Sequence, residues 1–214
     1  MLVHPQARGS IGLWIEVHTA QSVGEVQTVQ ELYGDTPVGH LHTLGFLGPD
    51  VILGHCIYID THPDIGCCGQ ERDLKLIADA GSSVAHSPLP FARGGAALHS
   101  LPKYLDHGIN VGIGCDIWPA DIIEEMRLAS FLAKVTGKDP TALPARQTLA
   151  LGTLLGARAL HMADRIGSLE VGKQADIVAV DLTQPHSTPR YRVAEDNIYS
   201  QLIYTTAPSD VRHV

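Results

Sequence analysis

The stretch Ile109-Asn-Val-Gly-Ile-Gly-Cys-Asp-Ile-Trp-Pro119 is the part of the chain around which the fold is organised. Ile109, Val111 and Ile113 alternate with small or polar residues, which is the pattern of a short β-strand. Asp116 follows this strand, and the chain then turns into a helix. An acidic residue at the carboxyl end of such a strand lies where α/β enzymes place their chemistry. Taken alone, Asp116 is better explained as a turn former or a helix cap.

Three earlier segments end in the same way, each with a histidine after an apolar run. The segments 11–18, 50–55 and 82–86 are expected to be strands that end in His18, His55 and His86. Helical patterns lie between the strands and after the last one, over residues 22–33, 70–80, 100–107 and 122–133. This alternation predicts an α/β fold with parallel strands and right-handed crossovers. Parallel strands point the same way, so the three histidines and Asp116 are expected to converge on one rim. That shared position favours a site over four separate structural roles.

Other patterns predict local structure. Ser22 and Glu25 have the spacing of a capping box at the start of a helix, and capping explains Glu25 better than catalysis does. Residues 89–95 are expected to form a loop, and 149–160 a continuous helix. A strand is expected near Ile177–Val180, and the chain ends in a second strand-like segment. The pair His40-x-His42 has a metal-ligand spacing, but no apolar strand precedes it, so surface histidines near a helix end are expected.

The composition excludes several classes of function. The chain has 214 residues, 44% of them hydrophobic, and a formal net charge of −8. Nucleic-acid binding is not expected, because phosphate contacts need clustered Lys and Arg. No apolar run reaches the roughly 18 residues of a membrane span, and the N-terminus lacks the layout of a signal peptide. The cysteines (Cys56, Cys67, Cys68 and Cys115) suggest neither a disulfide framework nor a thiolate zinc site, so a cytoplasmic location is expected.

The segment Gly167-Ser-Leu-Glu-Val-Gly-Lys-Gln-Ala-Asp-Ile-Val178 closely resembles the C-terminal signature of the amidohydrolase superfamily. Together with Val17–Gln21, Gly54–Cys56, Ala85–Pro88 and Gly114–Asp116, it is similar to the branch that holds cytosine and guanine deaminases and the chlorohydrolase-like triazine hydrolases. The resemblance covers the chain from about residue 11 onward.

This resemblance implies a (β/α)8 TIM-like barrel with a small β-sandwich built from both chain ends. A full barrel needs about 250 residues, so we expect only the C-terminal half here. Residues 1–165 would supply barrel strands five to eight, and residues 166–214 part of the sandwich. The family's first-strand His-x-His ligands have no match, and His40-x-His42 is not assigned to that role. Because half a barrel has open edges, we expect a homo-oligomer or pairing with a missing N-terminal half.

The resemblance also implies a role for each strand-end residue. His18 would be a metal ligand, and Asp116 would bind the metal and accept the proton of its water. His55 would orient the water or polarise the substrate, and His86 and Gln21 would contact the substrate. The expected cofactor is a divalent metal, zinc first and iron as the other candidate, since imidazole and carboxylate suit both.

Position 21 departs from the family pattern, which is His-x-x-Glu after the fifth strand. An amide can hydrogen-bond a ring nitrogen but cannot protonate it, and loss of general acid catalysis costs roughly 10²–10⁴ in rate. The leading interpretation is a metal-dependent hydrolase that acts on a C–N bond of a purine, pyrimidine or triazine, by deamination or by amine or halide displacement. The alternative is a catalytically inactive fragment or a subunit that completes a partner's barrel. A plain α/β binding domain is the third interpretation.

Overall fold

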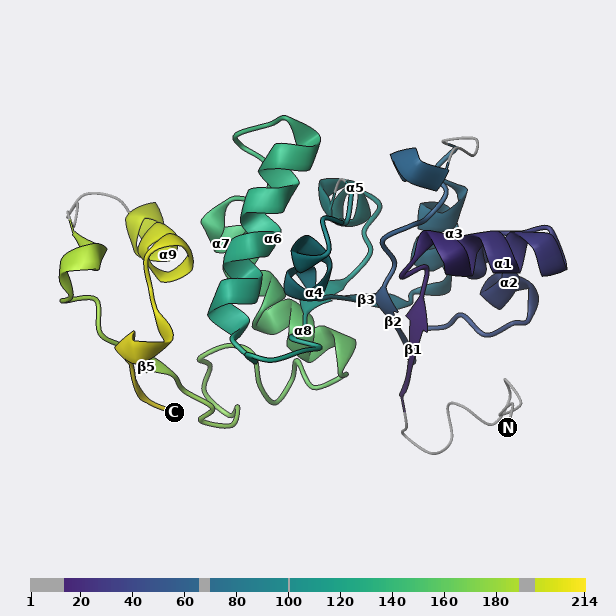
Figure 1. Ribbon diagram of the computed structural model, residues 1–214. Coiled ribbons are helices and arrows are strands. Elements are labelled where there is room, and N and C mark those ends of the chain that lie inside the picture. The colour runs from purple at the N-terminus through teal and green to yellow at the C-terminus, as the bar shows by residue number, and fades with distance from the viewer. Residues whose placement is uncertain (1–13, 66–69, 100, 189–194) are drawn as a thin grey trace. The chain divides into compact units, whose positions relative to one another are not determined.

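The structure is a computed structural model that describes residues 14–65, 70–99, 101–188 and 195–214 (Figure 1). Contacts between residues group the chain into two units. The first unit consists of Met1–His86 and Ala97–Val111, and the second of Ser87–Ala96 and Gly112–Val214. The start of the strand expected from Ile11, the pair Cys67–Cys68 and residue Ser100 lie outside the described residues.

A four-stranded sheet carries the strand-end residues. Its strands, in the order in which they lie in the sheet, are β1 (Ile15–Thr19), β2 (Val51–His55), β3 (Ser83–His86) and β4 (Val111–Ile113). β1 pairs in parallel with β2, and β2 in parallel with β3. The backbone N–H of Val84 donates to the carbonyl of Asn110, just before β4 begins, at 2.9 Å. The predicted α/β fold with parallel strands in chain order is therefore confirmed for this sheet.

Helices follow the strands of the first unit, as the sequence predicted. They are α1 (Val23–Tyr33), α2 (Pro37–Thr43), the 3-10 helix η2 (Pro63–Ile65), α3 (Arg72–Ala80) and α5 (Leu101–Asp106). Leu53 of β2 and Leu74 and Ile77 of α3 are fully buried. His40 and His42 lie in α2, where the His40 ring stacks on Tyr33 with 3.9 Å between centroids and His42 is exposed. The expectation that this pair belongs to a helix surface is confirmed.

Half of the capping box expected at the start of α1 is formed, because Ser22 caps the helix whereas Glu25 binds N–H groups that precede Ser22. The Ser22 hydroxyl accepts the backbone N–H of Glu25 at 3.1 Å. The Glu25 carboxylate accepts the N–H groups of Ala20 at 2.8 Å and Gln21 at 2.9 Å, so it reaches back across the whole turn after β1. Gly34, at φ 70°, ends the helix in the left-handed conformation. Both carboxylate oxygens of Glu25 are thus used in holding the connection between β1 and α1.

Replacing Ser22 by alanine is expected to cost about 1 kcal/mol of unfolding free energy, because a helix N-terminal N–H loses its acceptor. Urea denaturation followed by circular dichroism measures the effect. Thr28→Ala is the matched control, since Thr28 lies in the exposed middle of α1, where alanine is the better helix former. Equal losses for the two variants would contradict the capping role.

The second unit is built around its longest helix, α6 (Ile122–Gly137). The other helices and strands of this unit are α4 (Pro88–Arg93), α7 (Ala145–Leu151), α8 (Leu154–Ala159), β5 (Ala179–Val180), η3 (Pro185–Ser187), α9 (Glu195–Tyr204), η4 (Pro208–Asp210) and β6 (Val211–His213). α6 packs against α4, α7 and α9. Met126, Ala145 and Ile203 from three of these helices form a buried cluster.

Two local predictions in this unit were wrong. Residues 89–95, expected to be a loop, begin with helix α4, whose first residue is Pro88, a position that suits proline. The helix expected over 149–160 is broken into α7 and α8 at Gly152. A Cβ at Gly152 would lie 2.4 Å from the Met126 sulfur, so α6 approaches the chain closely at this point. Both features depend on contacts with α6, which is distant in sequence.

The tail forms a small antiparallel pair. β5 is shorter than the strand expected around Ile177–Val180, and it pairs with β6 at the end of the chain. Ile177 and Val178 are half-exposed. The assignment of residues 166–214 to a part of a sandwich, and the boundary after residue 165, remain predictions. Among the described residues, no helix combines the length and apolarity that a membrane crossing requires.

Candidate metal centre at the strand ends

His18 lies near the end of β1 and is exposed. It is opposite Gly54 of β2 in the parallel register. A Cβ built on Gly54 would come within 3.1 Å of the His18 ring, so the imidazole lies directly over this glycine. Because glycine has no side chain, position 54 leaves room for the His18 ring on the surface of the sheet.

His55 is the last residue of β2 and is buried, with 3% of its surface exposed. Its backbone has φ 74°, which is rare for a residue with a side chain. The backbone N–H of Cys56 donates to the carbonyl of Thr19 at 3.0 Å, which ties the end of β2 to the end of β1. The rings of His18 and His55 meet edge to face, with 4.5 Å between centroids.

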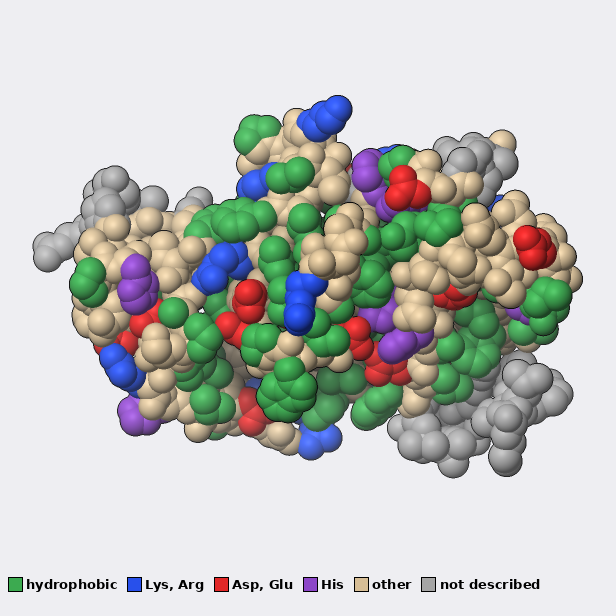
Figure 2. Space-filling model, in the orientation of Figure 1, with side chains coloured by type: hydrophobic (Ala, Val, Ile, Leu, Met, Phe, Trp, Pro, Cys, Tyr) green, Lys and Arg blue, Asp and Glu red, His purple; other side chains and the backbone are tan. Residues whose placement is uncertain are grey.

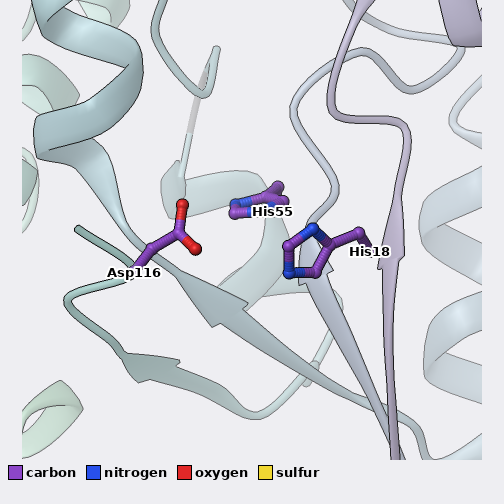
Figure 3. Close-up of side chains that lie close together, drawn as sticks. All are labelled: His18, His55 and Asp116. Carbon is purple, nitrogen blue, oxygen red and sulfur yellow. The ribbon is translucent and has the colours of Figure 1, made fainter.

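Asp116 follows β4 and is exposed. It also has a left-handed backbone, at φ 58°, and the adjacent N–H of Ile117 donates to the carbonyl of Cys115 at 2.6 Å. Figure 3 shows the carboxylate of Asp116 and the imidazoles of His18 and His55 directed toward one another. One ligand atom from each of the three side chains lies within 4.8 Å of the others. The residues present therefore fit a divalent metal, because two imidazole nitrogens and a carboxylate oxygen are a donor set typical of zinc.

The geometry adds to the sequence prediction for His55. The sequence predicted His55 to be a catalytic group beside the metal. In the structure one of its ring nitrogens also lies within 4.8 Å of donor atoms of the two predicted ligands, His18 and Asp116. A side chain in this position can hold a metal or orient a water bound to it. The sequence alone did not separate these two roles.

His86 ends β3 and is 2% exposed. Burial, with a further contribution from nearby His55, lowers the pKa of His86 to about 3, so its imidazole is neutral at physiological pH. Its Nδ1 atom has no hydrogen-bond partner among the described residues. His86 is not a member of the group of three donors within the described part of the chain.

Gln21 is exposed in the turn between β1 and α1. Its backbone N–H is bound to Glu25, and this bond fixes the turn while leaving the amide side chain at the surface. Because Glu25 already accepts two backbone N–H groups, it is not free to replace the missing acid at position 21. The predicted structural role of Glu25 is confirmed.

Sequence analysis did not single out Glu125 of α6. Glu125 is fully buried, and its Oε2 atom accepts the N–H of Leu89 in the first turn of α4 at 2.9 Å. Burial raises the pKa of Glu125 to about 7, and the negative charges of Glu124 and Asp116 act in the same direction. The signal was present in the spacing, since Glu125 shares a helix face with Ala129 and Ala133.

Glu125 is expected to make the fold less stable as the pH rises. Its pKa is higher in the folded chain than its ordinary value of 4.5, so the stabilising contribution of the protonated form is lost as the pH rises through about 7. Between pH 5 and pH 8 we expect the unfolding free energy to fall by about 2 kcal/mol more in the parent chain than in Glu125→Gln. Denaturation at a series of pH values measures this, with Glu124→Gln as the control. Parallel pH profiles for the parent and Glu125→Gln would show that the carboxyl group is not perturbed.

A model of the amidohydrolase family matches residues 6–214. The chain belongs to the amidohydrolase family. The resemblance to the branch of deaminases and triazine hydrolases, which the sequence predicted, is confirmed, because the proteins similar to this amidohydrolase chain include both kinds of enzyme.

Curated relatives of the amidohydrolase chain include deaminases. It is 38% identical to a 5-methylthioadenosine/S-adenosylhomocysteine deaminase of Syntrophobacter fumaroxidans, over 92% of this chain and 42% of the relative. It is 35% identical to a 5'-deoxyadenosine deaminase of Methanosarcina barkeri, over 94% of this chain and 44% of the relative. The amidohydrolase chain thus spans less than half the length of these relatives.

Solved structures are also similar to nearly the whole of this chain, over less than half of their own length. An adenosine deaminase from Xanthomonas campestris with bound zinc matches 96% of this chain and 44% of its own, with 33% identity and a TM-score of 0.84. Atrazine chlorohydrolase from Arthrobacter aurescens, complexed with zinc, matches 97% of this chain and 43% of its own, with 26% identity and a TM-score of 0.77.

Proposed function

We propose that this amidohydrolase chain carries half of the active site of a metal-dependent hydrolase, which cleaves a C–N bond of a nitrogen heterocycle. The observation that carries the proposal is the group of donor atoms from His18, His55 and Asp116 within 4.8 Å of one another. The deaminase names of the relatives support a purine-like substrate that loses an amine. The zinc in two similar structures supports zinc as the metal, with iron as the alternative.

In this proposal His18 and Asp116 hold the metal, and His55 either completes the ligand set or orients the water. A divalent metal supplies hydroxide at neutral pH by lowering the pKa of a bound water to about 7. The carboxylate of Asp116 would accept the proton of such a water. The hydroxide would add to the electron-poor ring carbon that bears the leaving group, and the bond to that group would break as an amine leaves with a proton or a halide leaves as an anion.

His86 and Gln21 are assigned to the substrate. The neutral imidazole of His86 has an Nδ1 atom without a partner among the described residues, so it can accept or donate one hydrogen bond to a ring atom. The amide of Gln21 can hydrogen-bond a ring nitrogen but cannot protonate it. The proposed reaction therefore has only weak acid catalysis when an amine leaves. A halide needs no such catalysis, because it leaves without a proton.

The proposal includes the architecture and setting of the whole protein. The chain would contribute barrel strands five to eight within residues 1–165 and part of a small sandwich within residues 166–214. The chain covers 42% and 44% of two relatives, which supports the proposal that an N-terminal half, or other copies of the chain, supply the rest of the barrel. A small heterocycle is the proposed ligand, with no role for nucleic acid or a membrane, and the proposed location is the cytoplasm.

A second candidate is a non-catalytic polypeptide that completes the barrel of a partner. Gln21 favours it, because the position that delivers the proton in the family pattern has no acid. Such a polypeptide would retain the fold and the metal ligands without turning over substrate.

The test is ammonia release by the purified chain, loaded with zinc, from adenosine, 5'-deoxyadenosine and S-adenosylhomocysteine. If copies of the chain complete the site, the leading proposal predicts zinc-dependent release from at least one of them and its loss in Asp116→Ala. Zinc binding without turnover of these substrates, or of a chloro-triazine, would overturn that form of the proposal, because the non-catalytic candidate predicts the same inactivity.

A further inference from the structure

Helix α6 has an exposed face that is apolar. Its buried residues include Glu125, Met126, Ala129, Ser130 and Ala133, which lie on one side. The opposite side carries four residues that lie within about 40° of one line on a helix of 100° per residue, and Lys138, the C-cap residue after the helix, continues their spacing. We call them the outer stripe: Glu124, Leu128, Phe131, Val135 and Lys138.

The middle of the outer stripe is hydrophobic and open to solvent. Phe131 is 45% exposed and Val135 is 70% exposed, and Leu128 is half-buried. Hydrophobic side chains reach the surface over α6 in Figure 2. A helix on the surface of a globular protein normally turns polar residues to solvent on this side. Contiguous exposed apolar residues with polar ends are typical of an interaction surface.

The neighbouring polar side chains do not cover the stripe, because they are bound to their own unit. Arg127 donates from Nε to the carbonyl of Ile203 at 2.9 Å. Lys134 donates from Nζ to the carbonyls of Ala142 and Leu143, at 2.7 and 3.0 Å. The ring of Phe131 stacks on Tyr204 with 5.4 Å between centroids, and this contact holds it in place without burying it.

The spacing along the stripe matches a helix-pairing seam. From Glu124 to Lys138 the steps are four, three, four and three residues, the repeat by which two helices pack side by side. Glu124 lies in the first turn of the helix and Lys138 caps its last turn, each seven residues from Phe131. The stripe thus has an acidic end, an apolar middle and a basic end, centred on Phe131.

We propose that the outer stripe of α6 binds the same stripe of a second copy of this chain, with the two helices antiparallel and the two Phe131 side chains at the twofold axis. In this arrangement Glu124 of each chain faces Lys138 of the other, so the same ion pair forms twice. Parallel pairing would instead place like charges together. The symmetry of the charges about Phe131 is what selects a second copy over an unrelated partner.

The dimer is expected to be weak. A helix of 16 residues is about 24 Å long, and a single helix pair buries less than the roughly 800 Å² per partner of a standard interface. Association should therefore depend on protein concentration and on salt, because the end contacts are exposed ion pairs.

Charge reversal tests the proposal on the 214-residue chain by sedimentation equilibrium. Glu124→Lys and Lys138→Glu should each weaken the dimer about tenfold, because two attractive pairs become repulsive. The double variant restores opposite charges and should return to within about threefold of the parent. Glu31→Lys, an exposed charge reversal on α1, is the matched control and should leave dimerisation unchanged.

Two further variants keep the test decisive. Phe131→Cys should form a disulfide between two chains on mild oxidation, because this residue would meet its own copy at the axis, whereas Glu31→Cys should not. Circular dichroism shows that each variant keeps its helices. The proposal is overturned if the double charge reversal is as weak as the single ones, or if Phe131→Cys and Glu31→Cys cross-link equally. A chain that stays monomeric up to about 1 mM would overturn it as well, because even the weak pair described here associates at that concentration.

Discussion

We expect the substitution His18→Ala to abolish zinc binding at the candidate centre, and this is the largest effect on metal binding that we expect from a single substitution. The three donor atoms of the candidate centre come from three separate strand ends, and two donors alone bind a metal much more weakly than three. Changes in the partners of metal ligands already cost about 10–100-fold in affinity, so loss of a ligand should cost more. Zinc content after dialysis, and competition with a chelating dye, measure the loss.

His42→Ala is the matched control, since His42 is an exposed histidine of α2 outside the donor group. It should keep the zinc content of the parent. Equal zinc content in His18→Ala and the parent would show that any metal in this chain is bound elsewhere. Loss in both variants would indicate a general effect on folding, which circular dichroism would reveal.

Gln21→Glu is expected to raise the rate of deamination by about 10²–10⁴-fold, because a carboxyl group can deliver the proton that an amide cannot. Position 21 lies in the turn that immediately follows β1 and His18, and its side chain is exposed. The measurement is ammonia release from an adenosine-type substrate by the zinc-loaded chain. Gln27→Glu, an exposed substitution in α1, is the control and should leave the rate unchanged.

The leaving group gives a second check on the same variant. Chloride departs without a proton, so hydrolysis of a chloro-triazine should gain little from Gln21→Glu. If both reactions accelerate equally, the new carboxylate acts through charge or binding rather than as an acid. If neither changes, position 21 does not reach the substrate.

The parts of the fold that were predicted from the sequence depend on short-range patterns. The alternation of apolar residues in β4, the N-cap at Ser22 and the glycine at position 34 each act within a few residues of themselves. The order of strands and helices then follows, since parallel strands need crossovers. The convergence of His18, His55 and Asp116 was predicted because strand ends in a parallel sheet share one rim.

The parts that were not predicted depend on distant contacts. Helix α4 begins where Glu125, 36 residues away, accepts the N–H of Leu89. The break between α7 and α8 occurs where Met126 packs against Gly152. The neutral state of His86 and the high pKa of Glu125 both come from burial, which no local pattern reports.

The left-handed residues at the strand ends limit how this chain can be redesigned. Ala20, His55 and Asp116 all have positive φ values, between 51° and 74°, where glycine, asparagine and aspartate are accommodated most easily. A mutant library that samples all amino acids at positions 55 and 116 would therefore lose many members to misfolding before any chemistry is screened. Keeping His55 and Asp116 unchanged, and diversifying positions 21 and 86 fully, would direct the screen to new substrates.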